Sequence, residues 1–193
     1  MERNRILYFL KLSCFLIFAG RAYQHLFWDA PFRSILWDQQ LLEPLVNKVL
    51  NMNWSIYVTD LNIDENIQKM IRINGLFYLL CAVISLKISF TSKKIVKFIL
   101  LLGGINLFVL ALLLTKNKFY HIAMFFEHAI QFGTPVILYF FLKNNSVSWL
   151  LRILKVVISL SFACHGLYAI GLIYPIPETF VTMTINILPI NDS

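Results

Sequence analysis

Five long stretches of the chain consist almost entirely of apolar residues, and polar turns separate them. They cover residues 5–27, 72–91, 95–115, 119–142 and 149–174. At 1.5 Å per residue, a helix of about 20 residues crosses about 30 Å of hydrocarbon, and a helix satisfies all its own backbone hydrogen bonds there. The pattern therefore predicts an all-α, polytopic transmembrane bundle of about five spans, forming a single domain over residues 1–193.

The longest connection, residues 28–71, is more than a linker because its apolar residues recur at spacings of three and four. Pro44 is expected to restart a helix at its first turn, and Asp64 is expected to cap the helix that leads into the second span. With tryptophans nearby, the pattern predicts an interfacial or re-entrant helix pair; a small soluble cap on the helix ends is the alternative. A further interfacial helix is expected after the last span.

The composition supports a membrane protein. Hydrophobic residues make up 59% of the 193 residues, charged residues make up 14%, and the mean hydropathy is +0.70. Soluble domains are about 45–50% apolar and about 25% charged, so these values disfavour a soluble protein. The net charge of +7 does not indicate nucleic-acid binding, because the basic residues lie in short turns and not in a patch interleaved with exposed aromatic residues.

The basic residues also predict an orientation. If the amino terminus is inside, the inner side carries Arg3, Arg5, Lys11, Lys87, Lys93, Lys94, Lys97, Lys143, Arg152 and Lys155. Nearly all acidic residues then lie outside. Since cationic loops stay in the cytoplasm, we expect a multi-pass protein of the cell membrane, the inner membrane in a bacterium, with a cytoplasmic amino terminus and an external carboxyl terminus. The expected partners are the lipid bilayer, a membrane or periplasmic protein, and a second copy of the chain.

A partial internal repeat is also predicted, in which residues 5–37 correspond to residues 149–181. A shift of 144 positions brings identical residues together at seven pairs, including Lys11 with Lys155 and Pro31 with Pro175, and it places Arg21 on His165. The chain would then hold one full unit and the opening of a second.

Polar side chains inside the apolar stretches are the candidate site. A charge at the centre of a spanning helix costs roughly 2.5–3.5 kcal/mol on insertion scales, so such residues are expected to face one another rather than lipid. The predicted pocket residues are Arg21, His25, Asn106, His121, Glu127, His128, Gln131 and His165. Arg21 and Glu127 are the expected ion pair, and Gly133 with Pro135 is expected to kink the fourth span beneath the pocket.

This set of residues is compatible with several functions. Histidines beside a carboxylate could relay protons, bind a quinone carbonyl or ligate a haem. The same residues could instead only stabilise the packing of the helices through hydrogen bonds between them. We expect no metal site, because the chain has no H-x-x-x-H, E-x-x-H or C-x-x-C spacing. The leading hypothesis is redox-associated small-molecule binding; the alternatives are a non-catalytic subunit or scaffold that docks partners through the outer loop, and a transporter-like half unit. No catalytic residue is identified.

Two helix-end segments add a family resemblance. Residues 18–26 (FAGRAYQHL) and 162–168 (FACHGLY) resemble the first-helix signature of DoxX-like membrane proteins, in which a glycine and a histidine lie near the outer end of an apolar helix. The resemblance implies a compact bundle in the inner membrane, in some members linked to redox or quinone reactions. His25 and His165 are the residues that correspond. The long outer loop and the fifth helix depart from the four-helix layout of that family.

Overall fold

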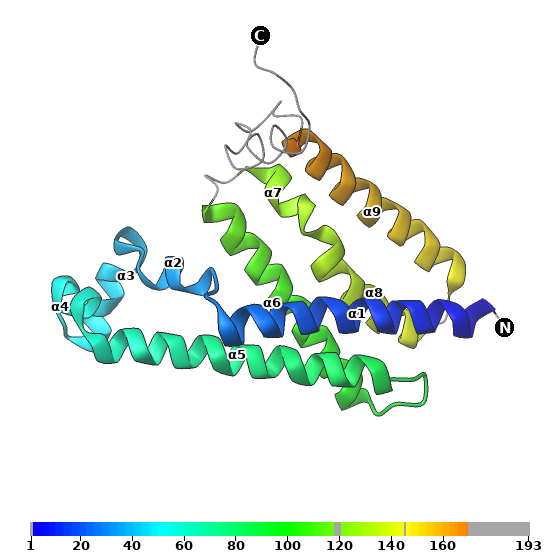
Figure 1. Cartoon of the computed structure of the whole chain (residues 1–193), viewed down its shortest axis with the longest axis horizontal. Helices are drawn as coiled ribbons and strands as arrows, with labels where there is room; N and C mark the ends of the chain where they lie inside the picture. Colours follow the sequence, from blue (N-terminus) through cyan, green and yellow to red (C-terminus); the bar gives the residue numbers. More distant parts are fainter. Residues whose placement is uncertain (1, 118–120, 145, 170–193) are drawn as a thin grey trace, which may run out of the picture.

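The computed structural model describes residues 2–117, 121–144 and 146–169. Helices joined by short turns make up this part of the chain, which contains no β-strand (Figure 1). The long helices are α1 (Glu2–Phe27), α5 (Leu61–Lys87), α6 (Lys94–Asn117) and α9 (Val147–Ala169), and each contains a stretch long and apolar enough to cross a membrane. The predicted all-α, multi-pass membrane bundle is therefore confirmed.

The fourth predicted span, residues 119–142, is not one helix. It is divided at His128 into α7 (Ile122–Glu127) and α8 (Ala129–Asn144). In the gap lies the hydroxyl of Ser161 from α9, which donates to the Phe126 carbonyl (3.1 Å) and accepts from the Ile130 amide (3.1 Å). In a continuous helix these two backbone groups, four residues apart, would bond to each other. The hydroxyl therefore takes the place of one backbone hydrogen bond, and such insertion is a recognised cause of helix bending.

The kink predicted at Gly133 and Pro135 lies instead at His128. α8 continues through Gly133 and Pro135, although the proline leaves the carbonyl four residues earlier without its usual partner. The interruption lies at His128, and its cause is a side chain from another helix rather than the proline.

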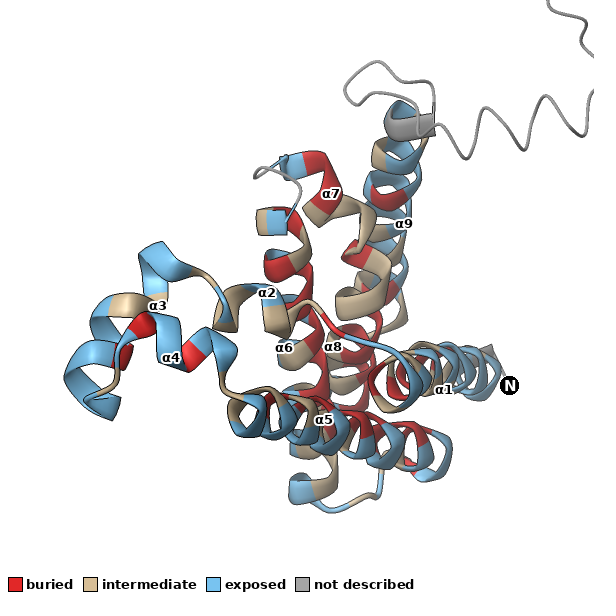
Figure 2. Ribbon diagram, turned by 60° about the vertical axis from the view of Figure 1, so that its left-hand side comes forward, coloured by how far each residue is buried: buried red, intermediate tan, exposed pale blue. Residues whose placement is uncertain are grey.

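The helices form two groups that cross obliquely. α1 and α5 run antiparallel and side by side, while α6, α8 and α9 form the second group, with α7 between the upper ends of α6 and α9 (Figures 1 and 2). The core lies where the groups meet, and its fully buried residues include Phe18 of α1, Tyr78 of α5, Leu100 of α6 and Phe141 of α8. α9 is the most peripheral, since Leu150 and Ser161 are its buried residues over the range 147–167.

The predicted repeat cannot be followed to its end. Most of the segment after its second helix, like the interfacial helix expected after the last span, lies outside the described residues. In the part that can be compared, the equivalent aromatic residues have different surroundings: Phe18 is fully buried, whereas Phe162 is 67% exposed. The repeat therefore stays a prediction.

The outer connection is a series of short helices. They are α2 (Phe32–Leu36), α3 (Gln39–Leu45), a π-helical turn η1 (Val46–Leu50) and α4 (Trp54–Thr59). Asp38 caps α3 by accepting from the Leu41 amide (3.0 Å), and Pro44 lies near the end of α3 rather than at the start of a helix. The predicted cap of the next helix is also wrong, because α5 begins earlier and Asp60 caps it by accepting from the Asn62 amide (2.8 Å).

The outer surface of these short helices remains apolar. Leu41, Leu45, Val49 and Leu50 are all exposed, and in Figure 2 this part of the chain extends beside the bundle with mostly exposed residues. An apolar exposed face is what an interfacial segment requires, but it also fits a cap that packs against a partner. Both predicted alternatives therefore stay open.

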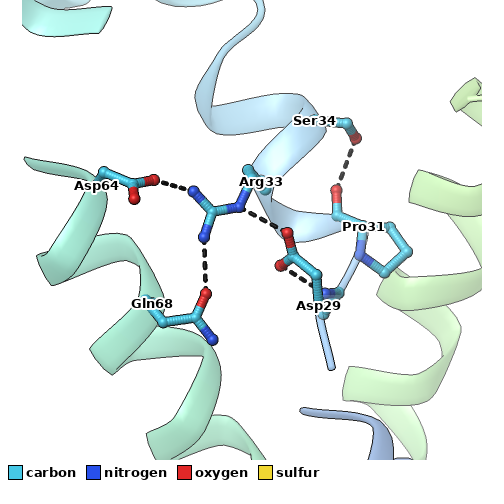
Figure 3. Close-up of polar contacts among 7 residues, drawn as sticks. Asp29, Pro31, Arg33, Ser34, Asp64 and Gln68 are labelled. Atoms are coloured by element: carbon cyan, nitrogen blue, oxygen red, sulfur yellow. Dashed lines mark hydrogen bonds and ion pairs between the residues drawn. The ribbon is translucent and has the colours of Figure 1, made fainter. Parts of the chain in front are cut away.

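Two cations tie this connection to the long helices. Arg33 donates to Asp29 (2.7 Å) and Gln68 (2.7 Å) and also pairs with Asp64, so that it joins α2 to the first turns of α5 (Figure 3). Lys116 at the end of α6 pairs with Asp38, and this hydrogen bond lowers the pKa of the Asp38 carboxyl. The start of the outer connection is thus fixed to α5 and α6.

Replacing Arg33 with glutamine is expected to loosen α2. The variant loses the charge that holds Asp29 and Asp64, and because both carboxylates are about half exposed we expect a loss of about 1 kcal/mol. Amide hydrogen exchange in Phe32–Leu36 should then be roughly fivefold faster. The matched control is Lys69→Gln, which removes a surface-exposed pair with Glu65 within α5. Equal exchange in α2 for the two variants would contradict the role assigned to Arg33.

Candidate functional site

Arg21 lies in an open groove between α1 and α8. The groove has a volume of about 470 Å³ and is lined by Leu16, Ile17, Gly20, Arg21, Gln24 and Gln131; we call it the Arg21 groove. The guanidinium donates through Nη1 to Gln24 Oε1 (2.6 Å) and through Nε to Gln131 Oε1 (3.1 Å), and Nη2 also donates to the latter oxygen. Two neutral amides therefore position the cation.

The predicted ion pair between Arg21 and Glu127 is wrong. Arg21 forms no ion pair with any described residue, and Glu127 instead accepts from His165 Nδ1 of α9 (2.9 Å). The physical reason is the break at His128. Glu127 and Gln131 are four residues apart and would share one face of a continuous helix. With the helix interrupted between them, Glu127 contacts α9 while Gln131 contacts α1.

His25 is the second buried group beside Arg21. Its Nδ1 donates to the Arg21 carbonyl (2.8 Å), which leaves Nε2 as the acceptor nitrogen of the neutral ring. The ring is fully buried between Tyr78 and Phe32, whose ring centroids lie 5.0 Å and 5.8 Å away. Nε2 has no hydrogen-bond partner among the described residues.

His128 occupies the helix break itself. It lies within electrostatic reach of both Arg21 and Glu127, and its buried Nδ1 has no hydrogen-bond partner in the described part of the chain. An unpartnered ring nitrogen can accept or release a proton when a ligand or a water molecule reaches it. His121, by contrast, is exposed at the start of α7, where it is the residue that precedes the helix.

Asn106 belongs to a different contact. Its Nδ2 donates to Asn74 Oδ1 (2.5 Å), which joins α6 to α5. The two amides line one side of an apolar cavity of about 290 Å³ beneath α2. The Asn106 amide is thus satisfied by α5 and does not take part in the contacts around Arg21.

Seven of the eight predicted residues separate into distinct contacts, and His121 lies at the start of α7. Arg21 and Gln131 meet directly, with His25 bonded to the Arg21 backbone and His128 nearby; Glu127 pairs with His165; and Asn106 pairs with Asn74. The sequence interpretation did not identify Gln24, Asn74 or Ser161. Gln24 follows Arg21 by three residues and so shares its helix face, a spacing that could have indicated it. A serine in an apolar helix gives no such signal.

Cofactor chemistry is not defined by these contacts. Across residues 2–117, 121–144 and 146–169, no group of three or more His, Cys, Asp or Glu side chains is arranged to hold a metal ion. The arrangement offers a guanidinium and two amides in a groove that Leu16, Ile17 and Gly20 also line, together with two buried imidazole nitrogens without described partners and a carboxylate held by an imidazole.

Comparison with known proteins does not add a function. No known protein family, no curated protein and no solved structure matches the chain. The resemblance to DoxX-like proteins therefore stays a prediction.

Proposed function

We propose that this chain is a multi-pass protein of the cell membrane, with a cytoplasmic amino terminus and an external carboxyl terminus, that binds an amphipathic carboxylate in the Arg21 groove. The ligand would place its carboxylate on the Arg21 guanidinium and its apolar tail along the α1 surface. The function is binding of a small molecule, and the proposal assigns no catalytic step.

The observation that carries the proposal is a cation that has no counter-ion among the described residues. Arg21 lies in an apolar spanning helix, where an uncompensated charge costs roughly 2.5–3.5 kcal/mol on insertion scales. Its described partners, Gln24 and Gln131, contribute amide dipoles but no negative charge. A guanidinium that binds a carboxylate donates two charge-assisted hydrogen bonds in a planar geometry, and these are stronger than hydrogen bonds to neutral amides.

The shape of the groove fits the apolar part of such a ligand. Its volume of about 470 Å³ falls within the range of about 300–1,000 Å³ that small-molecule sites occupy. Leu16 is 61% exposed along the groove, and nothing lies within 4 Å of the position that a side chain at Gly20 would occupy. The groove is therefore open along α1, where the acyl chains of the membrane would run.

Replacing Arg21 with glutamine is expected to weaken binding of oleate by about tenfold or more, since hydrogen bonds to charged groups contribute about 1.5–3 kcal/mol. Binding of tritiated oleate to the purified protein in zwitterionic nanodiscs measures the effect. Arg72→Gln is the matched control, because Arg72 is exposed on α5 and lies outside the groove. Methyl oleate, which has no charge, should bind weakly to the unaltered protein and to both variants. Equal affinity for oleate and methyl oleate, or equal loss in both variants, would refute the proposal.

A second candidate is redox-associated binding of a quinone, the role that the DoxX-like resemblance implies. It is favoured by the two buried imidazole nitrogens without described partners, His25 Nε2 and His128 Nδ1; His25 is bonded to the Arg21 carbonyl, and His128 lies within electrostatic reach of Arg21. Decylubiquinone, which is neutral, separates the candidates in the same assay. Binding of the quinone that exceeds oleate and falls on His128→Ala would favour this candidate, and a haem absorption band in the purified protein would extend it to haem.

A further inference from the structure

The end of the bundle opposite the Arg21 groove has an excess of positive charge. The α5–α6 turn, the start of α6 and the end of α8 meet there, because Lys97 Nζ of α6 donates to the carbonyl oxygens of Phe90 (2.8 Å) and Leu142 (3.3 Å). The cations of this region include Lys87, Lys93, Lys94, Lys97 and Lys143. The sequence contains no aspartate or glutamate between Glu65 and Glu127 or between Glu127 and Glu178.

These charges are not neutralised within the described chain. The ion pairs among its residues involve Arg33, Lys69, Lys116 and His165, none of which lies at this end. Arg3 approaches from α1 and adds to the charge, with its guanidinium carbon 3.9 Å from the centre of the Phe90 ring. No described carboxylate pairs with these side chains, so they are available to an anion from outside the chain.

A groove collects part of this charge next to apolar side chains. It has a volume of about 780 Å³ and lies between the start of α6 and the end of α8; we call it the basic groove. Lys94 and Lys143 are exposed and contribute ammonium groups from its two sides, while Lys97 is held by the two carbonyls. Phe98 and Tyr139 supply aromatic surface, and Phe98 is half exposed.

The combination of charges and apolar surface identifies the kind of occupant. A free anion would use the ammonium groups but not the aromatic surface, whereas an acyl chain alone would not use the lysines. A phospholipid uses both, and basic pockets between spanning helices near the membrane surface are known to bind anionic headgroups. The two lysines lie at the ends of α6 and α8, where a helix that crosses the bilayer meets the headgroups.

We propose that the basic groove binds an anionic phospholipid, with the phosphate between Lys94 and Lys143 and an acyl chain along Phe98. This site is separate from the Arg21 groove, shares no residue with it and does not depend on the function proposed there. The lipid supplies the negative charge that the chain lacks between Glu65 and Glu127.

The test compares lipid retention by two double variants of equal net charge. Lys94→Gln with Lys143→Gln removes the proposed phosphate ligands, whereas Lys48→Gln with Lys69→Gln removes two exposed lysines elsewhere. Purified proteins are titrated with phosphatidylglycerol or phosphatidylcholine, and bound lipids are counted by native mass spectrometry. We expect the first double variant to bind phosphatidylglycerol at least tenfold more weakly than the unaltered protein, and the second to bind it normally. Melting temperatures of the two double variants check that both are folded. A third double variant, Lys94→Arg with Lys143→Arg, keeps the charges and should retain the lipid.

Three results would overturn the proposal. Equal weakening in both double variants would show that net charge alone attracts the lipid. Equal retention of phosphatidylcholine and phosphatidylglycerol by the unaltered protein would show that the lysines do not select an anion. Displacement of phosphatidylglycerol by millimolar inorganic phosphate would show that the groove takes a free anion rather than a lipid.

Discussion

Replacing Gly103 with valine is expected to destabilise the bundle by about 1–3 kcal/mol, because the glycine lets three helices approach one another. A Cβ atom at this position of α6 would lie 2.8 Å from Cζ of Phe18 in α1 and 2.9 Å from Sγ of Cys81 in α5. Neither neighbour can move away easily, since both are fully buried and the Phe18 ring stacks on Tyr78 with a centroid distance of 6.1 Å. The expected result is a lower melting temperature of the purified protein in detergent.

Gly20→Val is the matched control for this prediction. Gly20 also lies within a long helix, but nothing is within 4 Å of the position of its missing Cβ atom. The substitution there should leave the melting temperature nearly unchanged, because a residue with a side chain forms helix at least as well as glycine does. Equal destabilisation at Gly20 and Gly103 would mean that the close contact of α1, α5 and α6 is not the cause of the effect, because Gly20 has no such contact.

The helices could be predicted from the sequence because their cause is local. An unbroken apolar run has to be a helix in hydrocarbon, and polar turns such as the one around Lys93 end it regardless of what packs beside it. The start of α5 was misplaced because two aspartates offer a cap. Asp64 was expected to cap the helix that leads into the second span, whereas α5 begins at Leu61 and is capped by Asp60.

The contacts of the site could be predicted only in part. Arg21 and Gln131 were identified because polar residues in an apolar helix have to find a partner, but the sequence does not show which partner each one finds. That choice depends on the direction in which α7 and α8 point, and this direction is set at His128 by a hydroxyl thirty-one residues away from Ile130 in the chain. A proline gives a visible local signal for a kink, whereas an inserted serine from another helix gives none.

The same serine determines whether Arg21 can have a carboxylate partner from within the chain. If α7 and α8 formed one helix, Glu127 would lie on the face that carries Gln131 and could approach Arg21. With Ser161 inserted, Glu127 pairs with His165 instead, at 2.9 Å. The break thus leaves the guanidinium available to an external anion, and the proposed binding function depends on it.

Replacing Ser161 with alanine is therefore expected to alter both stability and geometry. The Phe126 carbonyl and the Ile130 amide lose the part-buried partner that they share, and the loss of a hydrogen bond costs about 0.5–1.5 kcal/mol, so the melting temperature should fall. Because Ser161 also links α7 to α9, the two helices should separate, which electron paramagnetic resonance would detect as a longer distance between spin labels at the exposed residues Ile122 and Leu167. Ser159→Ala is the control, since Ser159 is exposed on α9 and should change neither quantity. If Ser161→Ala left the melting temperature and the label distance as they are in the control, the hydroxyl would not be what ties the helix break to α9, and the absence of a carboxylate beside Arg21 would need another cause.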